Sequence, residues 1–213
     1  MKVCAIVPAY NEGPRVAAVT SVLKKCRKVD QILVINDGST DNTAEAAGAT
    51  GVEVLSLPHN MGKGAAVARG ISATTSDVIL LMDADLVGLT EKHVDDLLDP
   101  VINGEADMTV GIFRFGRVFT DLAQMMTTFL SGQRAINRSL IEPSELENTE
   151  YGLETMITQI ANEKSLRVKK VYLDDLTQVV KEEKLGLAEG SKLRAKMYWH
   201  VIKQVFKRLF RIK

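Results

Sequence analysis

The sequence predicts an α/β domain with a mostly parallel, doubly wound sheet and helices on both faces. Short apolar runs rich in Val and Ile alternate with segments of helical spacing through residues 3–85, and this alternation is typical of parallel sheets. Each of the four apolar runs ends in a polar or glycine-containing turn, which is where open α/β sheets bind ligands. At 213 residues the chain is long enough for one such domain with a sizeable core.

The expected elements follow in a regular order. In the first half, strands are expected at residues 3–7, 31–35, 52–57 and 78–82, and helices at 14–27, from about residue 40, and at 64–74. Ser39 or Thr40 is the expected N-cap of the second helix. In the second half, helices are expected at 91–103, 118–130, 154–163 and 192–213, and strands at 107–113 and 168–173. The alternation loosens after residue 85, so the fold prediction rests mainly on the first half.

Composition is ordinary for a soluble globular protein, with 46% hydrophobic and 25% charged residues. The apolar run that opens the chain reaches Pro8 too soon for a signal peptide, and no run approaches the roughly 20 residues needed to cross a bilayer. Cys4 and Cys26 lack metal-site spacing and are expected to be small core or surface residues in a reducing environment. We therefore expect a cytoplasmic protein.

The net charge of zero conceals an acidic body and a basic tail. Residues 191–213 contain eight Lys or Arg and no Asp or Glu. In a helix, Tyr198, Phe206 and neighbouring apolar residues form one stripe with lysines beside it, a pattern typical of a helix that lies in a membrane interface. The alternative is a helix packed on the rest of the domain or on a dimer partner. Nucleic acid is not an expected partner, because the body is acidic and no basic groove with interleaved aromatic residues is present.

Two carboxylates, Asp83 and Asp85, follow the fourth expected strand. Acidic side chains one residue apart can converge on a hard divalent cation if the strand ends in a turn, and such a cation could hold a diphosphate. The alternative is an acidic turn that only ends a strand, and an isolated Asp-x-Asp favours this alternative. The three turns before it change the balance.

The turns after the first two strands supply an aromatic ring and further carboxylates. Residues 7–12, Val-Pro-Ala-Tyr-Asn-Glu, form a pocket edge with a ring that can stack on a base. In the second turn, Gly38 permits a tight bend, and Asp37 is placed to accept the ring N–H of a uracil. Asp41 is better explained as a helix cap.

The turn after the third strand, residues 60–64 (Asn-Met-Gly-Lys-Gly), can bind an anion at a helix N-terminus. Its glycines let backbone N–H groups approach the anion, while Lys63 and Arg69 add positive charge. It is not a Walker loop, because the spaced glycines and the Lys-Ser/Thr pair are missing. Four successive strand ends thus offer groups for a base, a ribose, a phosphate and a metal ion.

Together these four motifs resemble the family 2 glycosyltransferases with a GT-A fold, including polyprenyl-phosphate sugar transferases and glucosyl-phosphoglycerate synthases. The resemblance is firm over about residues 1–115 and looser beyond. It implies a nucleotide-sugar-binding half at 1–115, an acceptor-side half at 116–190 and the basic amphipathic helix at 191–213. It also implies a nucleotide-sugar donor, with UDP-glucose expected, and Mg²⁺ or Mn²⁺ as the cofactor.

The same resemblance implies roles for individual residues. Asp85 is expected to bind the metal ion, which would stabilise the departing diphosphate as a Lewis acid. Asp83 is expected to act as a catalytic residue near the ribose or sugar. The remaining expected donor contacts are Pro8, Ala9, Tyr10, Glu12, Asp37, Lys63, Arg69 and Ala84.

Residues 130–138 and 151–154 resemble the acceptor side of the same enzymes. Ser131 and Gly132 could let an acceptor or sugar approach closely. Arg134 and Arg138 could draw an anionic group, and Arg134 is the expected catalytic residue of the two.

Glu154 could orient a sugar hydroxyl or act as a base, although a carboxylate that stabilises a helix N-terminus is an equal alternative. Phosphoglycerate enzymes carry a histidine as a third metal ligand, and residues 176–181 contain none. This difference argues against phosphoglycerate as the acceptor.

These observations predict a metal-dependent hexosyltransferase that moves glucose from UDP-glucose to a membrane-presented acceptor such as a polyprenyl phosphate. Within the family, the alternative is a soluble glucosyl-phosphoglycerate synthase-like transferase with a small anionic acceptor. Other classes are a sugar nucleotidyltransferase, which would need a glycine-rich basic loop where this chain has residues 8–12, and a non-catalytic sugar-nucleotide binding module. Peripheral contact with the inner face of the membrane and a homodimer are further expectations.

Overall fold

The computed structural model describes residues 1–114, 131–147 and 152–178. The chain divides into two units, Met1–Thr177 and Gln178–Lys213, and the described elements belong to the first apart from the last residue of β9. The helices expected at 118–130 and 192–213 lie outside the described residues.

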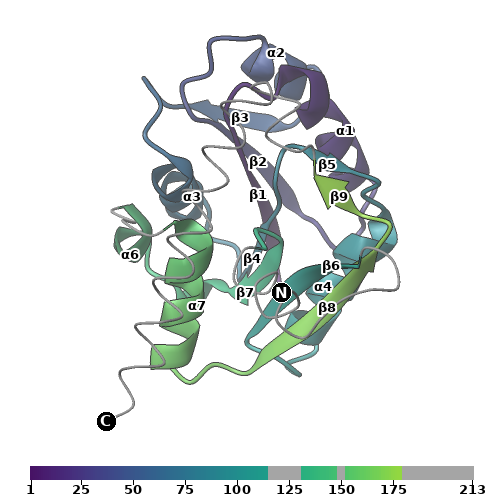
Figure 1. Cartoon of the computed structure of the whole chain (residues 1–213), viewed down its shortest axis with the longest axis vertical. Helices are drawn as coiled ribbons and strands as arrows, with labels where there is room; N and C mark the ends of the chain where they lie inside the picture. Colours follow the sequence, from purple (N-terminus) through teal and green to yellow (C-terminus); the bar gives the residue numbers. More distant parts are fainter. Residues whose placement is uncertain (115–130, 148–151, 179–213) are drawn as a thin grey trace. The chain divides into compact units, whose positions relative to one another are not determined.

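A seven-stranded sheet runs through the first unit (Figure 1). In spatial order its strands are β3 (Glu53–Ser56), β2 (Gln31–Asn36), β1 (Val3–Ala9), β4 (Val78–Leu81), β7 (Arg134–Asn137), β6 (Met108–Arg114) and β8 (Val168–Asp174). Only β7 runs antiparallel to its neighbours. A second, two-stranded sheet contains β5 (Leu86–Val87) and β9 (Thr177–Gln178). The predicted mostly parallel α/β fold is confirmed.

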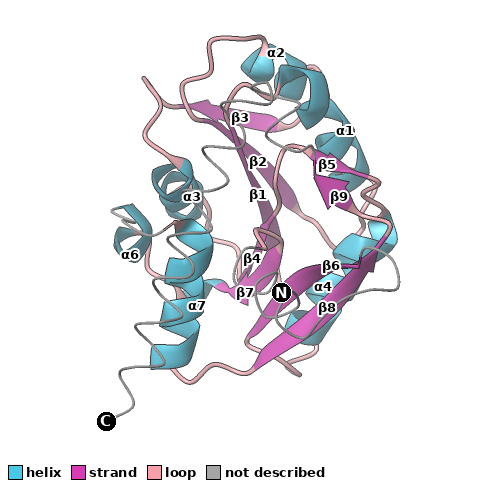
Figure 2. Ribbon diagram, viewed as in Figure 1, coloured by secondary structure: helices cyan, strands magenta, loops and turns pink. Residues whose placement is uncertain are grey.

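Helices cover both faces of the seven-stranded sheet (Figure 2). One face carries α1 (Gly13–Leu23), α2 (Thr43–Gly48) and α4 (Glu91–Ile102), and the other carries α3 (Lys63–Ser72), α6 (Ser144–Glu147) and α7 (Leu153–Glu163). β1 shows how the sequence forms both cores. Val3, Ala5 and Val7 enter the first core and Cys4 and Ile6 the second, because successive side chains of a strand point to opposite faces.

The second helix begins later than the sequence predicts. Its N-cap is Asn42 rather than Ser39 or Thr40. The Ser39 hydroxyl instead accepts a hydrogen bond from the Asn11 N–H at 3.0 Å, and the Thr40 N–H donates to Asn11 Oδ1 at 2.9 Å. Contacts with the first turn therefore prevent both residues from capping α2.

Strand β7 is the main element that the sequence does not reveal. Residues 130–138 are expected to form an acceptor-side segment with no strand assigned to it, but β7 occupies the place between β4 and β6, and the 3₁₀ turn η1 (Arg138–Leu140) follows it. The strand has four residues and begins with Arg134, which is only 1% exposed. Its guanidinium Nε donates to the Ser131 carbonyl at 3.0 Å, and this contact offsets part of the cost of burying a charged side chain.

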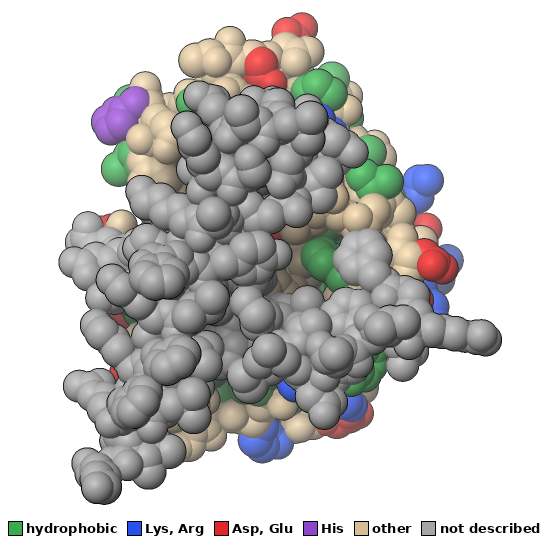
Figure 3. Space-filling model, in the orientation of Figure 1, with side chains coloured by type: hydrophobic (Ala, Val, Ile, Leu, Met, Phe, Trp, Pro, Cys, Tyr) green, Lys and Arg blue, Asp and Glu red, His purple; other side chains and the backbone are tan. Residues whose placement is uncertain are grey.

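Where the face drawn in Figure 3 shows described side chains, basic and acidic groups lie close together along the rim. Lys169 pairs with Glu105 at 2.8 Å, and Arg167 makes a 2.8 Å contact with Asp107. Within the described ranges, no helix has the length and hydropathy of a membrane span.

Candidate active site

The strand order of the sheet reverses between β1 and β4, which is where open α/β sheets bind ligands. β1 continues to Ala9, whereas its pairing with β4 ends where Ile6 lies opposite Leu81. Ile6 directs its backbone groups toward β4, and Pro8, two residues later, faces the same way. Pro8 nevertheless lies beyond Ile6, the last residue of β1 that pairs with β4. Its missing N–H therefore leaves no β4 carbonyl without a donor. The two strands separate at their carboxyl ends, next to the turns that follow β1 to β4.

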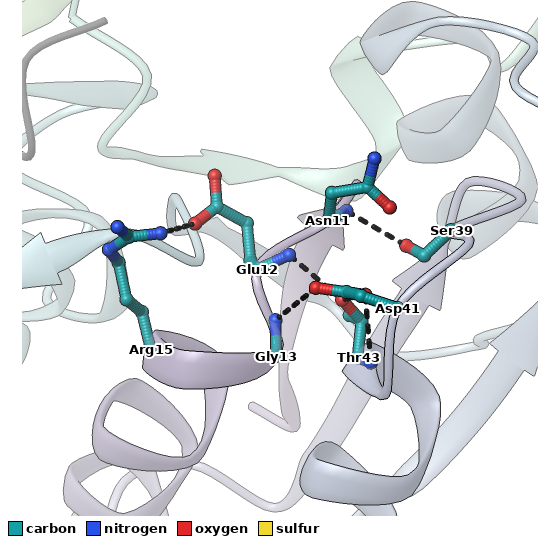
Figure 4. A network of polar contacts seen from close by, with 7 residues as sticks. All are labelled: Asn11, Glu12, Gly13, Arg15, Ser39, Asp41 and Thr43. Carbon is teal, nitrogen blue, oxygen red and sulfur yellow. Dashed lines mark hydrogen bonds and ion pairs between the residues drawn. The ribbon is translucent and has the colours of Figure 1, made fainter. Parts of the chain in front are cut away.

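The turn after β1 is hydrogen-bonded to the turn after β2 (Figure 4). The Asn11 N–H donates to Ser39 Oγ at 3.0 Å, and the Glu12 N–H donates to Thr43 Oγ1 at 2.8 Å. Asn11 has a φ of 55°, in the left-handed region that Asn tolerates better than most residues. These contacts fix the backbone from which the neighbouring predicted donor contacts project.

Asp41 joins the beginnings of two helices. Its carboxylate accepts from the Gly13 N–H at 3.1 Å, from the Thr43 N–H at 3.0 Å and from the Thr43 hydroxyl (Figure 4). Burial raises the pKa of Asp41, but these hydrogen bonds outweigh it and hold the pKa below its usual value. Asp41 thus accepts from N–H groups at the starts of α1 and α2, as expected of a capping carboxylate, although the N-cap residue of α2 is Asn42.

The predicted base-binding residues of the first turn differ in exposure. The Tyr10 side chain is available for stacking, since the residue is 44% exposed, whereas Pro8 and Ala9 form the end of β1. Glu12 is 9% exposed, and its carboxylate pairs with the Arg15 guanidinium at 3.1 Å.

Asp37 connects the turn after β2 to the turn after β3. Its carboxylate accepts from the Met61 N–H at 2.7 Å and from the Gly62 N–H at 2.9 Å, and the residue is 3% exposed. The adjacent Gly38 has a φ of 66°, and a Cβ there would lie 2.4 Å from the His59 carbonyl carbon. The two turns thus pack backbone against backbone, and Asp37 holds the segment that leads to Lys63.

Lys63 lies between two carboxylates rather than beside an open anion site. Its ammonium is 2.6 Å from Asp83 Oδ1 and 2.6 Å from Glu154 Oε1. Burial lowers the pKa of Lys63, but the two negative charges and their hydrogen bonds outweigh it and raise the pKa above its usual value. Residues from the starts of α3 and α7 and from the end of β4 therefore meet at one point.

Gly132 and Gln133 enclose Asp83 on another side. The Gln133 amide donates to Asp83 Oδ2 at 2.8 Å. A Cβ at Gly132 would lie 2.6 and 2.7 Å from the two Asp83 oxygens and 2.8 Å from Lys63 Nζ, so the glycine is required for this close approach. Sequence reasoning places Gly132 near the sugar but misses Gln133, although the residue falls within the resembling segment 130–138.

Ser131 and Arg134 are buried next to residues of the cluster. Ser131 is 5% exposed, and its hydroxyl donates to the Gln133 side-chain oxygen at 3.1 Å. Burial lowers the pKa of Arg134 to about 10, and the negative charge of Glu154 opposes that shift. Arg134 therefore contributes positive charge near Glu154 from a buried position.

Asp85 is the residue for which the sequence predicts metal binding. It lies half-buried in the turn between β4 and β5, and one buried residue, Ala84, separates it from Asp83, which contacts Lys63 and Gln133. The described part of the chain has no cluster of three or more His, Cys, Asp or Glu side chains arranged to hold a metal. One carboxylate suits Mg²⁺ or Mn²⁺ where a diphosphate and water supply the other oxygen ligands.

Two predicted residues are not brought to this site. Arg138 follows Asn137, which pairs with Val78 at the start of β4, so Arg138 lies at the opposite edge of the sheet. Its guanidinium donates to the carbonyls of Thr74 and Ile71, at 3.1 and 3.5 Å, which end helix α3. The expectation that Arg138 draws a substrate anion is therefore corrected: the residue stabilises a helix C-terminus.

Arg69 is exposed in the last turn of α3, six residues after Lys63. This spacing places it about 9 Å along the helix axis from the first residue of α3.

The chain matches the protein-family model "Glycosyl transferase family 2" over residues 4–162. Among curated proteins, a glucosyl-3-phosphoglycerate synthase of Mycolicibacterium smegmatis is 35% identical in an alignment of 109 positions that covers 47% of this chain and 36% of that protein. A dolichyl-phosphate beta-glucosyltransferase of Trichomonas vaginalis is 39% identical in an alignment of 94 positions that covers 38% of this chain and 28% of that protein. The matched segments thus span only about a third of these relatives' length.

Solved structures extend the similarity to nearly the whole chain. The glucosyl-3-phosphoglycerate synthase of Mycobacterium tuberculosis in complex with Mn²⁺ and UDP-glucose matches with a TM-score of 0.73 at 25% identity, covering 93% of this chain and 78% of that one. The same enzyme with Mg²⁺ and UDP matches with a TM-score of 0.70 at 23% identity and 93% coverage of this chain. The predicted GT-A fold is confirmed, and the chain belongs to glycosyl transferase family 2.

Proposed function

We propose that this protein is a metal-dependent glycosyltransferase that moves glucose from UDP-glucose to a phosphate-bearing acceptor. The observation that carries the proposal is the meeting of Lys63, Asp83 and Glu154 at the switch point of the sheet, with Asp85 in the next turn. The M. tuberculosis relative that shares this fold has been solved with Mn²⁺ and UDP-glucose, which supports the same donor and cofactor here.

The first three turns would hold the nucleoside of the donor. The exposed ring of Tyr10 would stack on uracil, beside Pro8 and Ala9 at the end of β1, and Glu12 would accept from the nucleoside. The segment that Asp37 orders would face the nucleotide.

Asp83-Ala84-Asp85 would act as a metal-binding Asp-x-Asp motif. Asp85 would hold Mg²⁺ or Mn²⁺, which supplies Lewis-acid stabilisation of the departing diphosphate when bound. Asp83 and Glu154 would accept hydrogen bonds from sugar hydroxyls, and buried Arg134 would keep positive charge near Glu154.

During transfer, the bond between the anomeric carbon and the diphosphate oxygen breaks, and UDP leaves with the bonding electrons. An acceptor oxygen forms the new bond to the same carbon. A phosphate acceptor is already ionised at neutral pH, so it requires little help from a base.

A lipid phosphate at a membrane surface is the first candidate for the acceptor. One similar curated protein is a dolichyl-phosphate beta-glucosyltransferase, and the eight basic residues of 191–213 would favour an anionic membrane surface. The protein would then be cytoplasmic, with peripheral contact at the inner face of the membrane. A homodimer formed through the same basic segment is the alternative role for that segment.

Phosphoglycerate is the second candidate, because similar curated proteins are glucosyl-3-phosphoglycerate synthases and one solved relative is in complex with phosphoglyceric acid. The absence of a histidine at residues 176–181 makes it the less favoured acceptor.

A donor and acceptor screen tests the proposal. The purified full chain is incubated with Mn²⁺ and each of several nucleotide sugars, with phosphoglycerate or with liposomes that contain a polyprenyl phosphate, and glucosylated product is measured by mass spectrometry. We expect product from UDP-glucose with the liposomes. In a parallel reaction that contains UTP and glucose 1-phosphate, formation of a nucleotide sugar would instead indicate a nucleotidyltransferase. UDP-glucose binding with no transfer to either acceptor would indicate a binding module.

A deletion separates the two roles of the basic segment. Removal of residues 191–213 should abolish sedimentation with anionic liposomes while transfer to a water-soluble acceptor analogue persists. Sedimentation that survives the deletion would reject the proposed membrane contact.

A further inference from the structure

We propose that Lys63 is a positioning residue that fixes the Glu154 carboxylate beside Asp83, where the donor sugar is expected to bind, rather than a ligand of the nucleotide. The inference rests on the proposed glucosyl transfer. It assigns to Lys63 a role that differs from the anion binding expected of a lysine in a glycine-containing loop.

The direction of the Lys63 side chain is the first observation. Its ammonium is 2.6 Å from an oxygen of Asp83 and 2.6 Å from an oxygen of Glu154, so two of its three N–H groups are directed at carboxylates. The two oxygens can be no further apart than twice that distance. Lys63 thus sets an upper limit on the separation of two acceptors that would otherwise repel each other.

The second observation is that the two carboxylates depend on Lys63 to different degrees. Asp83 also accepts from the Gln133 amide at 2.8 Å and is closely packed against Gly132. Within the described ranges, the hydrogen bond and ion pair of the Glu154 carboxylate are both with Lys63. Removal of the Lys63 ammonium should therefore release Glu154 and leave Asp83 largely in place.

The third observation is the position of Glu154 in its helix. It is the second residue of α7, directly after Leu153 and after Gly152, which has a φ of 87°. A side chain in a first helical turn has no preceding turn of the same helix to hold it. The contact across 91 positions of sequence therefore determines where this carboxylate lies.

The cluster is exposed enough for a sugar to reach it. The side chains of Lys63, Asp83 and Glu154 are 36%, 13% and 20% exposed. A carboxylate accepts hydrogen bonds on several lone pairs, so each can hold Lys63 and still accept from a sugar hydroxyl. Two acceptors at a fixed separation would select a hexose whose hydroxyls match that separation.

The test separates positioning from nucleotide binding. In K63M the side-chain stem is retained and the charge is lost. We expect its kcat for UDP-glucose to fall about 10- to 100-fold, because a displaced sugar is far from the reactive geometry. Its Kd for UDP with Mn²⁺, measured by calorimetry, should stay within about twofold of the wild-type value. A lysine that contacts the diphosphate would instead weaken UDP binding by about tenfold or more in K63M.

A double-mutant cycle tests whether Lys63 acts through Glu154. If it does, K63M/E154Q should have the same kcat as E154Q, because the carboxylate that Lys63 positions is already altered. The outcomes that would overturn the inference are losses that multiply in the double variant, a weakened Kd for UDP in K63M, and an E154Q variant with wild-type kcat. If K63M does not fold, K63R, which retains the charge, replaces it: UDP affinity unchanged with lowered kcat supports the inference, and weakened UDP binding overturns it.

Lys169→Met is the matched control. Lys169 pairs with Glu105 at 2.8 Å, both side chains are 52% exposed, and the residue lies opposite Thr109 near the start of β6 and β8, at the edge away from the site. The kcat of the K169M variant should equal that of the wild type. A wild-type protein with no transfer from UDP-glucose would reject the proposed function itself, whereas an active wild type with the wrong variant pattern would reject only the role of Lys63.

Discussion

Substitution of Asp37 by Asn tests how the nucleotide-binding turns are held together. The Asp37 carboxylate accepts from the Met61 and Gly62 N–H groups, at 2.7 and 2.9 Å, and the residue is 3% exposed. An Asn side chain has one acceptor oxygen, so its amide NH₂ must face one of these two N–H groups. The variant loses one charge-assisted hydrogen bond and leaves a buried donor without an acceptor, at a combined cost of about 2–3 kcal/mol.

Thermal unfolding measures this cost. For a chain of this size, each kcal/mol lowers Tm by about 2–4 °C, so we expect a decrease of about 5–10 °C in D37N. UDP affinity should fall as well, because the segment before Lys63 loses its order. Asp96→Asn is the control: Asp96 pairs with Lys92, whose side chain is 78% exposed, and such surface pairs contribute little.

Two results would contradict this account of Asp37. A Tm equal to that of D96N would mean that the carboxylate does not hold the turn. An unchanged Tm combined with an altered preference between uridine and cytidine nucleotides would show that Asp37 contacts the base directly.

Three further outcomes follow from the structure. Gly132→Ala should lower turnover about tenfold or more while the protein stays folded, since the added Cβ displaces the Asp83 carboxylate; wild-type kinetics would contradict the close packing. Asp41→Asn should cost about 1 kcal/mol in denaturant unfolding at pH 7, because the two carboxylate oxygens accept from the Gly13 and Thr43 N–H groups and an amide has one acceptor oxygen. The pKa of Asp41 is lower in the folded protein than in the unfolded chain. Its carboxylate therefore stabilises the fold above the usual pKa of Asp, and this stabilisation is lost as the pH falls through the lowered pKa. The free energies of unfolding of the wild type and D41N should thus converge in strong acid. Burial raises the pKa of Cys4 and of Cys26 to about 11, so neither thiol should react with a thiol reagent at pH 7.5 until the protein is unfolded; rapid labelling of the native protein would contradict the burial of both.

The fold was largely accessible from the sequence because its first half consists of local signals. The apolar runs that form β1, β2 and β4 are buried on both faces, so each appears as a short continuous stretch that ends in a turn. Strand β7 was not accessible, because a four-residue strand that begins with a buried arginine carries neither length nor alternation.

For the candidate site, the sequence indicates single residues but not the contacts between them. The positions of Asp83, Lys63 and Glu154 could be predicted, since each lies next to the end of a strand or the start of a helix. Their mutual contacts could not, because they join residues up to 91 positions apart. Arg138 shows the same limit: its place at the opposite edge of the sheet follows from the antiparallel direction of β7, which the sequence does not reveal.

The stoichiometry of a metal-controlled transfer reaction tests the central claim most directly. UDP and glucosylated acceptor are quantified together for the wild type and for Asp85→Asn, with Mn²⁺ and with a chelator. We predict that the wild type with Mn²⁺ releases one UDP for each glucose transferred, and that chelation or the loss of the Asp85 carboxylate abolishes both products. Equal transfer by wild type and Asp85→Asn, or transfer that persists in the chelator, would contradict a metal-dependent glucosyltransferase.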